Sequence, residues 1–371
     1  MGEIRIINLV GTPQERGYHH GQVLRDKIHH LYQRFIEMME GPPLGQKGSA
    51  AQFSERDLLA FALAHAPATK DYAPDLYAEI EGIAGGAGMS CGQVILLNCV
   101  AEVRRLMFTG SAARAVSRAL ATPPQPGCTC LAVQGRATAD QQVYIGQGYD
   151  IEPLWEPVVF RTQDREAGLE QVVMGHPGIL AQFGLNGAGL AFVGSGLLVS
   201  DQRPGVPAPV VARKILQQAR LSDALEVIVG AERTIGISYV VASSFGVVDL
   251  ETSAAAYNCH YLQEGVFACA NHIRSSALAH VYAGLYGLDS LVREGRMLQL
   301  LRAGHGALGV ESLQTIQADH ADFPVSICRH IVEGTSEAMT RCAAIIKPAE
   351  RTMWIAGGNP CERPYVEIQI Q

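Results

Sequence analysis

Residues 127–150 read GCTCLAVQGRATADQQVYIGQGYD, and a Pro-rich segment, TPPQP, precedes them at 122–126. Two apolar-leaning runs, 128–134 and 142–149, flank a turn-like segment, which is the pattern of a β-hairpin. Cys128 thus stands at the first position of a buried strand, directly after a glycine and a structure-poor loop. The rest of the chain is interpreted around this thiol.

The position of Cys128 favours a self-cleaving precursor. The thiol would attack the Gly127 carbonyl to form a thioester, and water would then free Cys128 as a new N-terminal residue. Glycine permits the backbone geometry that such an attack needs, and a thiol is nucleophilic even when mostly protonated. The freed α-amine, with an ordinary pKa of roughly 7.7–8.0, can act as the general base. The alternative is an inert core cysteine, because most buried cysteines are inert.

Several short motifs follow one another along the chain. They are Gly127-Cys128-Thr129, Gly146-Gln147-x-x-Asp150, Gly184-Leu185-Asn186-x-Ala188-Gly189-Leu190-Ala191 and Ala270-Asn271-His272. In this order the sequence resembles the acyl-coenzyme A:6-aminopenicillanic acid acyltransferase family (isopenicillin N acyltransferase-like, peptidase C45) of N-terminal nucleophile (Ntn) hydrolases. The resemblance spans nearly the whole chain, from Gly17 and Gly21 to Gly358-Asn359-Pro360-Cys361. Gln147 stands where the bile-salt hydrolase branch tends to have arginine, which favours the acyltransferase branch.

The resemblance implies a catalytic set of Cys128, Asp150 and Asn271, with cleavage between Gly127 and Cys128. Asp150 would orient the new α-amine, the role of a third group beside a nucleophile and its base. Asn271 would donate its side-chain amide to the oxyanion of the transition state. Both residues have plainer alternatives as turn residues at strand ends.

Three further residues are candidates for substrate binding: Ser238, which matches an active-site serine of the acyltransferase, and Tyr149 and Ser195 as pocket lining. An inward-facing serine on a strand is often plain core, so this alternative stays open. The pairs His19-His20 and His29-His30 lack the spacing and the glutamate of a His-Glu-x-x-His motif, so no metal is expected. No cofactor is expected either.

The hydrophobic pattern predicts an α+β fold, and the resemblance implies a four-layer αββα sandwich of two packed antiparallel sheets with a helical N-terminal segment. Residues 1–127 would be the alpha chain after self-cleavage, 128–371 the beta chain, and 111–126 the cleavage loop of one domain. N-caps are expected at Ser54, Ser90 and Ser222, and a helix stop at Gly85-Gly86. Single helices are predicted at 17–39, 54–64, 74–84 and 91–107, and further helices between residues 207 and 230, 277 and 303, and 312 and 318. Strands are predicted at 4–10, 129–134, 142–149, 157–163, 169–174, 179–185, 189–194, 237–243, 246–250, 254–260, 266–270, 338–346, 351–356 and 364–370.

Composition describes an ordinary globular protein, with 48% hydrophobic and 18% charged residues in a chain of 371. A net charge of −7 gives no electrostatic footprint for nucleic acid. Apolar runs fall short of the roughly 18–20 residues that a membrane span needs, and the N-terminus lacks a signal core. A cytoplasmic location is therefore expected. The nine dispersed cysteines predict free thiols rather than a disulfide framework.

The leading functional hypothesis is an autoprocessed enzyme that hydrolyses a small N-acyl amide or peptide through a thioester on Cys128. Acyl-coenzyme A-dependent transfer to an amine at the same site is the close alternative. A non-catalytic binding protein on the same scaffold, and a cysteine protease that pairs Cys128 with His176, His260 or His272, are further alternatives. The expected partner is a small amide or acyl-CoA substrate, with no nucleic acid or membrane. A homo-oligomer of processed heterodimers is left open.

Overall fold

The computed structural model of the chain describes residues 4–40, 53–109, 127–163, 168–263, 265–284 and 287–371, so the predicted cleavage loop at 111–126 lies outside the described residues. Within these ranges the strands form one eight-stranded and one six-stranded sheet. In spatial order the larger sheet contains β1 (Arg5–Val10), β4 (Val158–Gln163), β5 (Gln171–His176), β6 (Ile179–Asn186), β7 (Ala191–Leu197), β8 (Gly236–Ser243), β9 (Gly246–Thr252) and β10 (Tyr257–Leu262). The smaller contains β11 (Gly265–Cys269), β2 (Gly127–Gln134), β3 (Tyr144–Ile151), β12 (Met339–Lys347), β13 (Thr352–Ala356) and β14 (Val366–Gln369).

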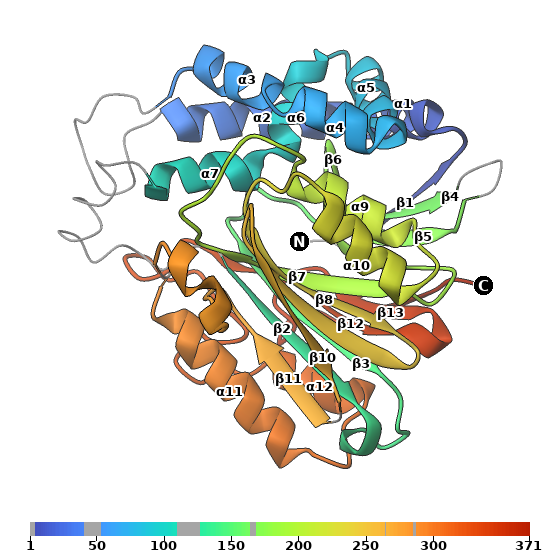
Figure 1. Ribbon diagram of the computed structural model, residues 1–371, viewed down its shortest axis with the longest axis vertical. Helices are drawn as coiled ribbons and strands as arrows, with labels where there is room; N and C mark the ends of the chain where they lie inside the picture. The colour runs from blue at the N-terminus through green and yellow to red at the C-terminus, as the bar shows by residue number, and fades with distance from the viewer. Residues whose placement is uncertain (1–3, 41–52, 110–126, 164–167, 264, 285–286) are drawn as a thin grey trace.

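The sheets pack face to face, with β2 and β3 against β7 and β8, and helices lie on both outer faces (Figure 1). Helices α6, α9 and α10 pack on the larger sheet, whereas α11 and α12 pack on the smaller one. This is the predicted α+β sandwich in four layers.

The helices are α1 (Pro13–Val23), α2 (Arg25–Glu40), α3 (Glu55–Leu63), α4 (Ala66–Tyr72), α5 (Pro74–Ala87), α6 (Cys91–Asn98), α7 (Val100–Thr109), α9 (Ala208–Leu216), α10 (Leu221–Gly230), α11 (Asp289–Ala303) and α12 (Val310–Gln317), with short 3₁₀ turns η1 (Gly135–Ala137), η2 (Ser276–Val281) and η3 (Pro348–Glu350).

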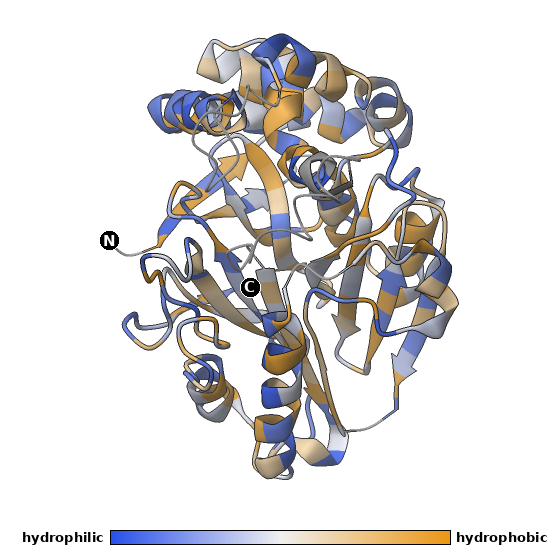
Figure 2. Ribbon diagram, turned by 90° about the vertical axis from the view of Figure 1, so that its left-hand side faces the viewer, coloured by the Kyte–Doolittle hydropathy of each residue, from blue (hydrophilic) through white to orange (hydrophobic). Residues whose placement is uncertain are grey.

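Both the strands and the helices carry a mixture of hydrophobic and hydrophilic residues (Figure 2). Every residue of β2 is buried, because one face of this strand lies against the larger sheet and the other under α11. A strand that is covered on both faces has a continuous run of apolar residues, and this run is why the sequence predicts the hairpin. All the predicted strands overlap observed strands.

One strand pair departs from the predicted antiparallel sheets. β1 pairs with β4 in parallel, with Arg5 opposite Val158. Periodicity cannot reveal this direction, because strands of either direction alternate their side chains in the same way. The consequence is that the segment before Gly127 contributes an edge strand to the larger sheet as well as helices.

Several predicted helix boundaries are wrong. The single helix expected at 17–39 is two helices that break at Leu24, and the one expected at 91–107 breaks between α6 and α7. Between residues 277 and 303, where helices were expected, the chain forms the short turn η2 and then α11. Ser54 and Ser90 do cap their helices through capping boxes. Ser222 does not: the N-cap of α10 is Arg220, without a side-chain hydrogen bond.

The predicted helix stop at Gly85-Gly86 is also wrong, since α5 continues to Ala87 and ends at Gly88 in the left-handed conformation, with φ of 70°. Its glycines serve a close helix crossing instead. A Cβ on Gly86 would lie 2.1 Å from the Tyr18 carbonyl oxygen of α1, and one on Gly17 of α1 would lie 2.0 Å from the Glu79 carbonyl oxygen. The two backbones therefore touch where neither helix carries a side chain.

No single helix among the described residues is long and apolar enough to cross a membrane; α5 and α6 reach that length and composition only as a pair bent by 118°.

The α1–α5 crossing predicts opposite effects for two adjacent glycines. Gly86→Ala should lower the free energy of unfolding by about 1–3 kcal/mol, because its Cβ meets backbone that must shift. In Gly85→Ala the new Cβ meets only the Tyr18 ring at 3.7 Å. In this control the free energy of unfolding should stay the same or rise by up to about 1 kcal/mol, because alanine has a higher helix propensity than glycine. Urea unfolding measures the free energy of unfolding of both variants, and an equal change in the two would refute the close crossing.

Candidate active site

Cys128 lies near the start of β2, a central strand of the smaller sheet between β11 and β3. The register places Gly127 opposite Asp150, and Cys128 opposite Tyr149. Because side chains alternate along a strand, the Cys128 thiol faces the larger sheet while the Asp150 carboxylate faces the α11 side. The hairpin thus brings Asp150 beside the backbone of Cys128 rather than beside its sulfur.

Asn271 holds the backbone nitrogen of Cys128. The Cys128 N–H donates to Asn271 Oδ1 at 2.9 Å. β11 pairs with β2 only from Cys130 onward, so the Asn271 side chain takes the place of a strand partner at residue 128. Asn271 Nδ2 donates to the Gly196 carbonyl oxygen at 3.1 Å. Because Cys128 donates and Gly196 accepts, the amide oxygen of Asn271 faces Cys128 and its nitrogen faces Gly196.

Arg293, on α11, was missed by the sequence analysis. Its Nη1 donates to the Cys128 carbonyl oxygen at 2.8 Å and to Thr129 Oγ1 at 2.7 Å. Its Nη2 donates to Asn271 Oδ1 at 3.0 Å, and its Nε pairs with Asp289 at 3.0 Å. Only the tertiary structure reveals this role, because an arginine on an amphipathic helix is ordinarily solvent-facing.

The Cys128 thiol is buried and accepts a hydrogen bond from Gln147 Nε2 at 3.2 Å. The Gln147 Oε1 in turn accepts from the Gly194 N–H of β7 at 2.9 Å, which orients the amide between the two sheets. Burial raises the pKa of Cys128 to about 12; the charge of Asp150 adds to this shift, while Arg293 and Gln147 oppose it. In the intact chain the thiol is therefore protonated at neutral pH.

Asp150 belongs to a buried network of charges. Thr340 Oγ1 donates to its Oδ1 at 2.7 Å, and Arg329 Nε lies 3.6 Å from its Oδ2. Burial raises the pKa of Asp150, opposed chiefly by the charges of Arg329 and Arg293. Among the described residues, Oδ2 accepts no hydrogen bond. Arg329 also pairs with Asp289, so the network continues to Arg293.

The three predicted substrate contacts already have partners inside the protein. Ser195 and Ser238 face each other across β7 and β8. Ser195 donates to the Ala270 carbonyl oxygen, and Ser238 donates to Asp249 Oδ1 at 2.7 Å. Tyr149 is half-buried, with its ring centroid 5.5 Å from that of His176. A role for these residues in substrate binding stays a prediction.

The histidines of the cysteine-protease alternative have other surroundings. His176 Nδ1 contacts the Glu156 carbonyl oxygen at 2.9 Å, and His272 Nδ1 contacts Ser290 Oγ at 2.8 Å. Burial lowers the pKa of each to about 4. His260 is exposed on β10. Within the part of the chain that the structure describes, the hydrogen bond to the Cys128 sulfur comes from Gln147 and not from a histidine.

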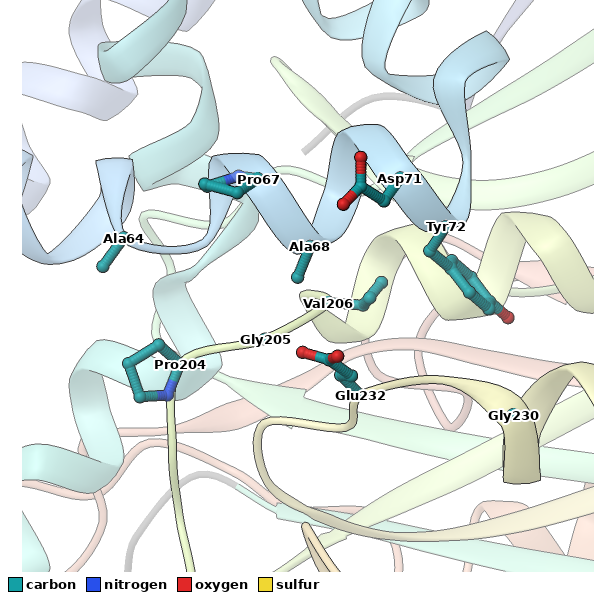
Figure 3. Close-up of a pocket in the computed structure, with 10 residues that line it drawn as sticks. All are labelled: Ala64, Pro67, Ala68, Asp71, Tyr72, Pro204, Gly205, Val206, Gly230 and Glu232. Atoms are coloured by element: carbon teal, nitrogen blue, oxygen red, sulfur yellow. The ribbon is translucent and has the colours of Figure 1, made fainter.

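A cavity of about 490 Å³ lies away from these residues (Figure 3). It is lined by α4, the loop before α9 and the end of α10, including Asp71, Tyr72 and Glu232. Cys128, Asp150 and Asn271 are not among its lining residues. The chemistry of the candidate site is therefore inferred from the contacts of Cys128 and not from the shape of this cavity.

Comparison with known proteins gives one family. The sequence model described as Acyl-coenzyme A:6-aminopenicillanic acid acyl-transferase matches residues 137–362. The Acyl-coenzyme A:6-aminopenicillanic-acid-acyltransferase 40 kDa form of Emericella nidulans is 26% identical over 357 residues, which are 94% of this chain and 91% of that protein.

Two solved structures show more distant likenesses. Penicillin V acylase from Agrobacterium tumefaciens is 16% identical with a TM-score of 0.43, over 62% of this chain and 83% of that one. A mutant of conjugated bile acid hydrolase from Clostridium perfringens is 9% identical with a TM-score of 0.44, over 66% of this chain and 97% of that one. The assignment rests on the sequence matches. With more than half of its residues matched, the chain belongs to the acyl-coenzyme A:6-aminopenicillanic acid acyltransferase family.

Proposed function

We propose that the chain is an autoprocessed enzyme that cleaves or transfers an amide-linked acyl group, with Cys128 as its nucleophile. The observation that carries this proposal is the hydrogen bond from the Cys128 N–H to Asn271 Oδ1 at 2.9 Å. Any buried backbone N–H needs an acceptor, but here a side-chain amide supplies it in place of β11, which pairs with β2 only from Cys130 onward. Such an acceptor is suited to hold the nitrogen beside its own sulfur after that nitrogen has left as an amine.

Cleavage would proceed between Gly127 and Cys128. The sulfur attacks the Gly127 carbonyl carbon, an S–C bond forms, the C–N bond breaks, and the thiol proton ends on the departing nitrogen. Water then hydrolyses the thioester and leaves a carboxylate on Gly127. Glycine suits this position because a Cβ on Gly127 would lie 2.6 Å from Asn271 Oδ1 and 2.9 Å from Arg293 Nη2.

Catalysis would use the groups that cleavage uncovers. The new α-amine takes the thiol proton, the thiolate attacks the substrate acyl carbon, and the amine product leaves with that proton. Asp150 is suited to stabilise the charged α-amine, because its Oδ2 is buried without a hydrogen-bond donor among the described residues. The Asn271 amide carries a second N–H that an oxyanion would use, in addition to the one that Gly196 accepts.

Water as the acceptor makes the enzyme an amidohydrolase, which is the leading proposal, with a small N-acyl amide or peptide as substrate. An amine acceptor with acyl-CoA as the donor makes it an acyltransferase at the same site. The second outcome is supported by the relative from Emericella nidulans, which is named for that activity. Assay of the purified protein with N-acyl amides, with and without acyl-CoA and an acceptor amine, separates the two.

Autoprocessing predicts two fragments from the purified wild-type protein, residues 1–127 and 128–371, by intact-mass analysis. Cys128→Ala should stay whole, because the attacking sulfur is missing. Cys130→Ala removes another buried cysteine of the same strand and should still be cleaved. A wild-type chain that stays intact under all conditions would remove the processing proposal and favour a non-catalytic binding protein.

Arg293→Lys tests the positioning of Cys128 and of Asn271, the acceptor of its N–H. Lysine keeps the charge but loses the planar fork, so it cannot hold Cys128, Thr129 and Asn271 together. We expect cleavage to slow by about tenfold or more, because a hydrogen bond from a charged group is worth about 1.5–3 kcal/mol. The control is Arg296→Lys on the same helix, where the arginine pairs with Asp319. Time courses of fragment formation measure the cleavage rate of each variant. Equal cleavage rates in the two variants would contradict the role of Arg293.

Thiol labelling tests the burial of Cys128. Because its pKa in the intact chain is about 12, each pH unit below that value lowers the thiolate fraction tenfold. Gly127→Ala should stay uncleaved, because its Cβ displaces Asn271 Oδ1 and Arg293 Nη2. In this intact variant, iodoacetamide labelling of Cys128 should be slow at pH 7 and should rise with pH through 10. After cleavage, labelling near pH 8 should be faster, because the α-amine accepts the proton. Peptide mass spectrometry with the exposed Cys259 as internal standard gives both rates; no acceleration after cleavage would exclude the amine as base.

A further inference from the structure

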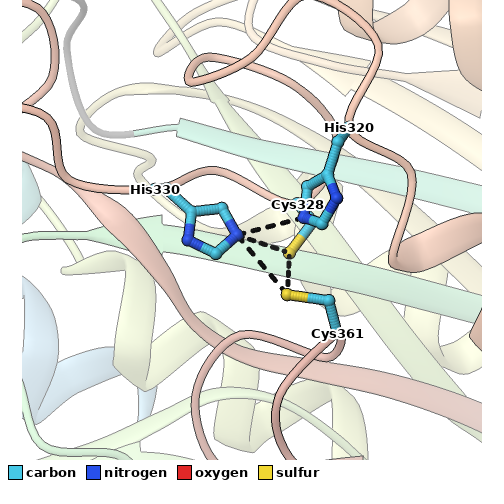
Figure 4. A group of neighbouring side chains, drawn as sticks. All are labelled: His320, Cys328, His330 and Cys361. Atoms are coloured by element: carbon cyan, nitrogen blue, oxygen red, sulfur yellow. Dashed lines mark hydrogen bonds between the residues drawn. The ribbon is translucent and has the colours of Figure 1, made fainter.

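Four side chains that the candidate active site does not use converge near the C-terminal end of the chain (Figure 4). His320, Cys328 and His330 lie between α12 and β12, and Cys361 lies between β13 and β14. Their ligand atoms all lie within 4.8 Å of one another. Cys328 is buried and His330 half-buried, whereas His320 and Cys361 are exposed. The group is therefore anchored in the protein and accessible from one side.

Four distances within the group match the edges of a metal tetrahedron, and the remaining pairs of ligand atoms lie within 4.8 Å. The two histidine Nε2 atoms are 3.1 Å apart and the two sulfurs 3.6 Å apart. His330 Nε2 lies 3.5 Å from Cys328 Sγ and 3.4 Å from Cys361 Sγ. Zinc bonds of about 2.3 Å to sulfur and 2.0–2.1 Å to nitrogen give tetrahedral edges of about 3.3, 3.8 and 3.6 Å for N–N, S–S and S–N. Each observed distance agrees with its edge within about 0.3 Å.

Hydrogen bonds alone do not account for this arrangement. His330 Nε2 contacts three atoms of the group, His320 Nε2 and both sulfurs, yet this nitrogen offers only one proton or one lone pair for a hydrogen bond. A disulfide does not account for it either, because the sulfur separation of 3.6 Å far exceeds the roughly 2.05 Å of an S–S bond. A cation in the centre satisfies all four atoms at once.

The neighbours of the group suit metal ligands. Asn359 Nδ2 lies 3.4 Å from Cys328 Sγ, where an N–H stabilises a thiolate. Glu362 Oε1 lies 4.0 Å from His330 Nδ1, on the side of the ring opposite the cluster. Metal-bound histidines commonly direct their second nitrogen to a carboxylate, which fixes the tautomer.

We propose that His320, Cys328, His330 and Cys361 bind a zinc ion in a structural site. Four protein ligands leave no open position for substrate, which is the property of structural rather than catalytic zinc. Both thiols lose their protons on binding, and the two thiolates balance the charge of the ion. The sequence did not predict this metal site, because the four ligands are dispersed and carry no Cys-x-x-Cys spacing.

The proposed zinc site adjoins the candidate active site through Arg329, which lies between two of the ligands. The Arg329 side chain is fully buried and pairs with Asp150 and Asp289. Its carbonyl oxygen accepts from Asn359 Nδ2 at 2.6 Å, and its N–H donates to Thr340 Oγ1 at 2.9 Å. By fixing Cys328 and His330, the ion fixes the backbone that directs Arg329 toward Asp150.

The test uses the full chain expressed with added zinc and purified without chelator. Elemental analysis should find one zinc per chain, and cobalt exchanged into the site should show thiolate-to-cobalt charge transfer and tetrahedral ligand-field absorption. The exposed ligands are changed first, as Cys361→Ser and His320→Asn, so that the chain still folds. Each variant should lower the affinity for zinc by more than roughly 10- to 100-fold, which is the loss typical of changing a residue that only hydrogen-bonds a metal ligand. Cys259→Ser and His260→Asn, an exposed pair on β10, are the matched controls and should retain zinc.

Three results would overturn the proposal. They are a folded wild-type chain without stoichiometric zinc, ligand variants that bind zinc as tightly as the wild type, and thiol titration that shows Cys328 and Cys361 joined as a disulfide. Zinc content is measured without any activity assay, so its outcome is independent of whether Cys128 is cleaved from Gly127.

Discussion

The buried guanidinium of Arg293 anchors the residue on which the proposed chemistry depends, Cys128. It binds the carbonyl oxygen of Cys128, while Asn271, which it also contacts, binds the nitrogen of the same residue. Both backbone polar groups of Cys128 are thus held by side chains that come from beyond the β2–β3 hairpin. A rigid fork of donors suits this task, because its geometry is set before any reaction begins.

A charge so deeply buried needs compensation, and the structure supplies it as an alternating series. Arg293 pairs with Asp289, Asp289 with Arg329, and Arg329 with Asp150. Removing one member would leave its neighbour charged and uncompensated, which is far costlier than losing a surface ion pair. The series runs beneath the start of β2, so α11 and the segment before β12 determine the electrostatic surroundings of the candidate nucleophile.

The sequence predicted the strands well and the helices less well, for a physical reason. The central strands are covered on both faces and therefore appear as apolar runs between turn residues, which local patterns reveal. The ends of helices depend on what packs against them. Gly85 and Gly86 looked like a stop, yet α5 continues past them, and the bare backbone of Gly86 meets α1 in a close crossing. Ser222 looked like a cap, yet it lies inside α10, which begins without one.

By itself, the sequence determined the sandwich of sheets, the hairpin that begins at Cys128, and the residues Asp150 and Asn271 that the structure places at its start. These features depend on local periodicity and on short motifs in a fixed order. Only the tertiary structure decided that Arg293 and Arg329 complete the site, that the Asp150 carboxylate lies on the face opposite the thiol, and that four dispersed histidines and cysteines meet. Such contacts join residues far apart along the chain, where side-chain chemistry leaves no local pattern and only the packing of the layers brings the groups together.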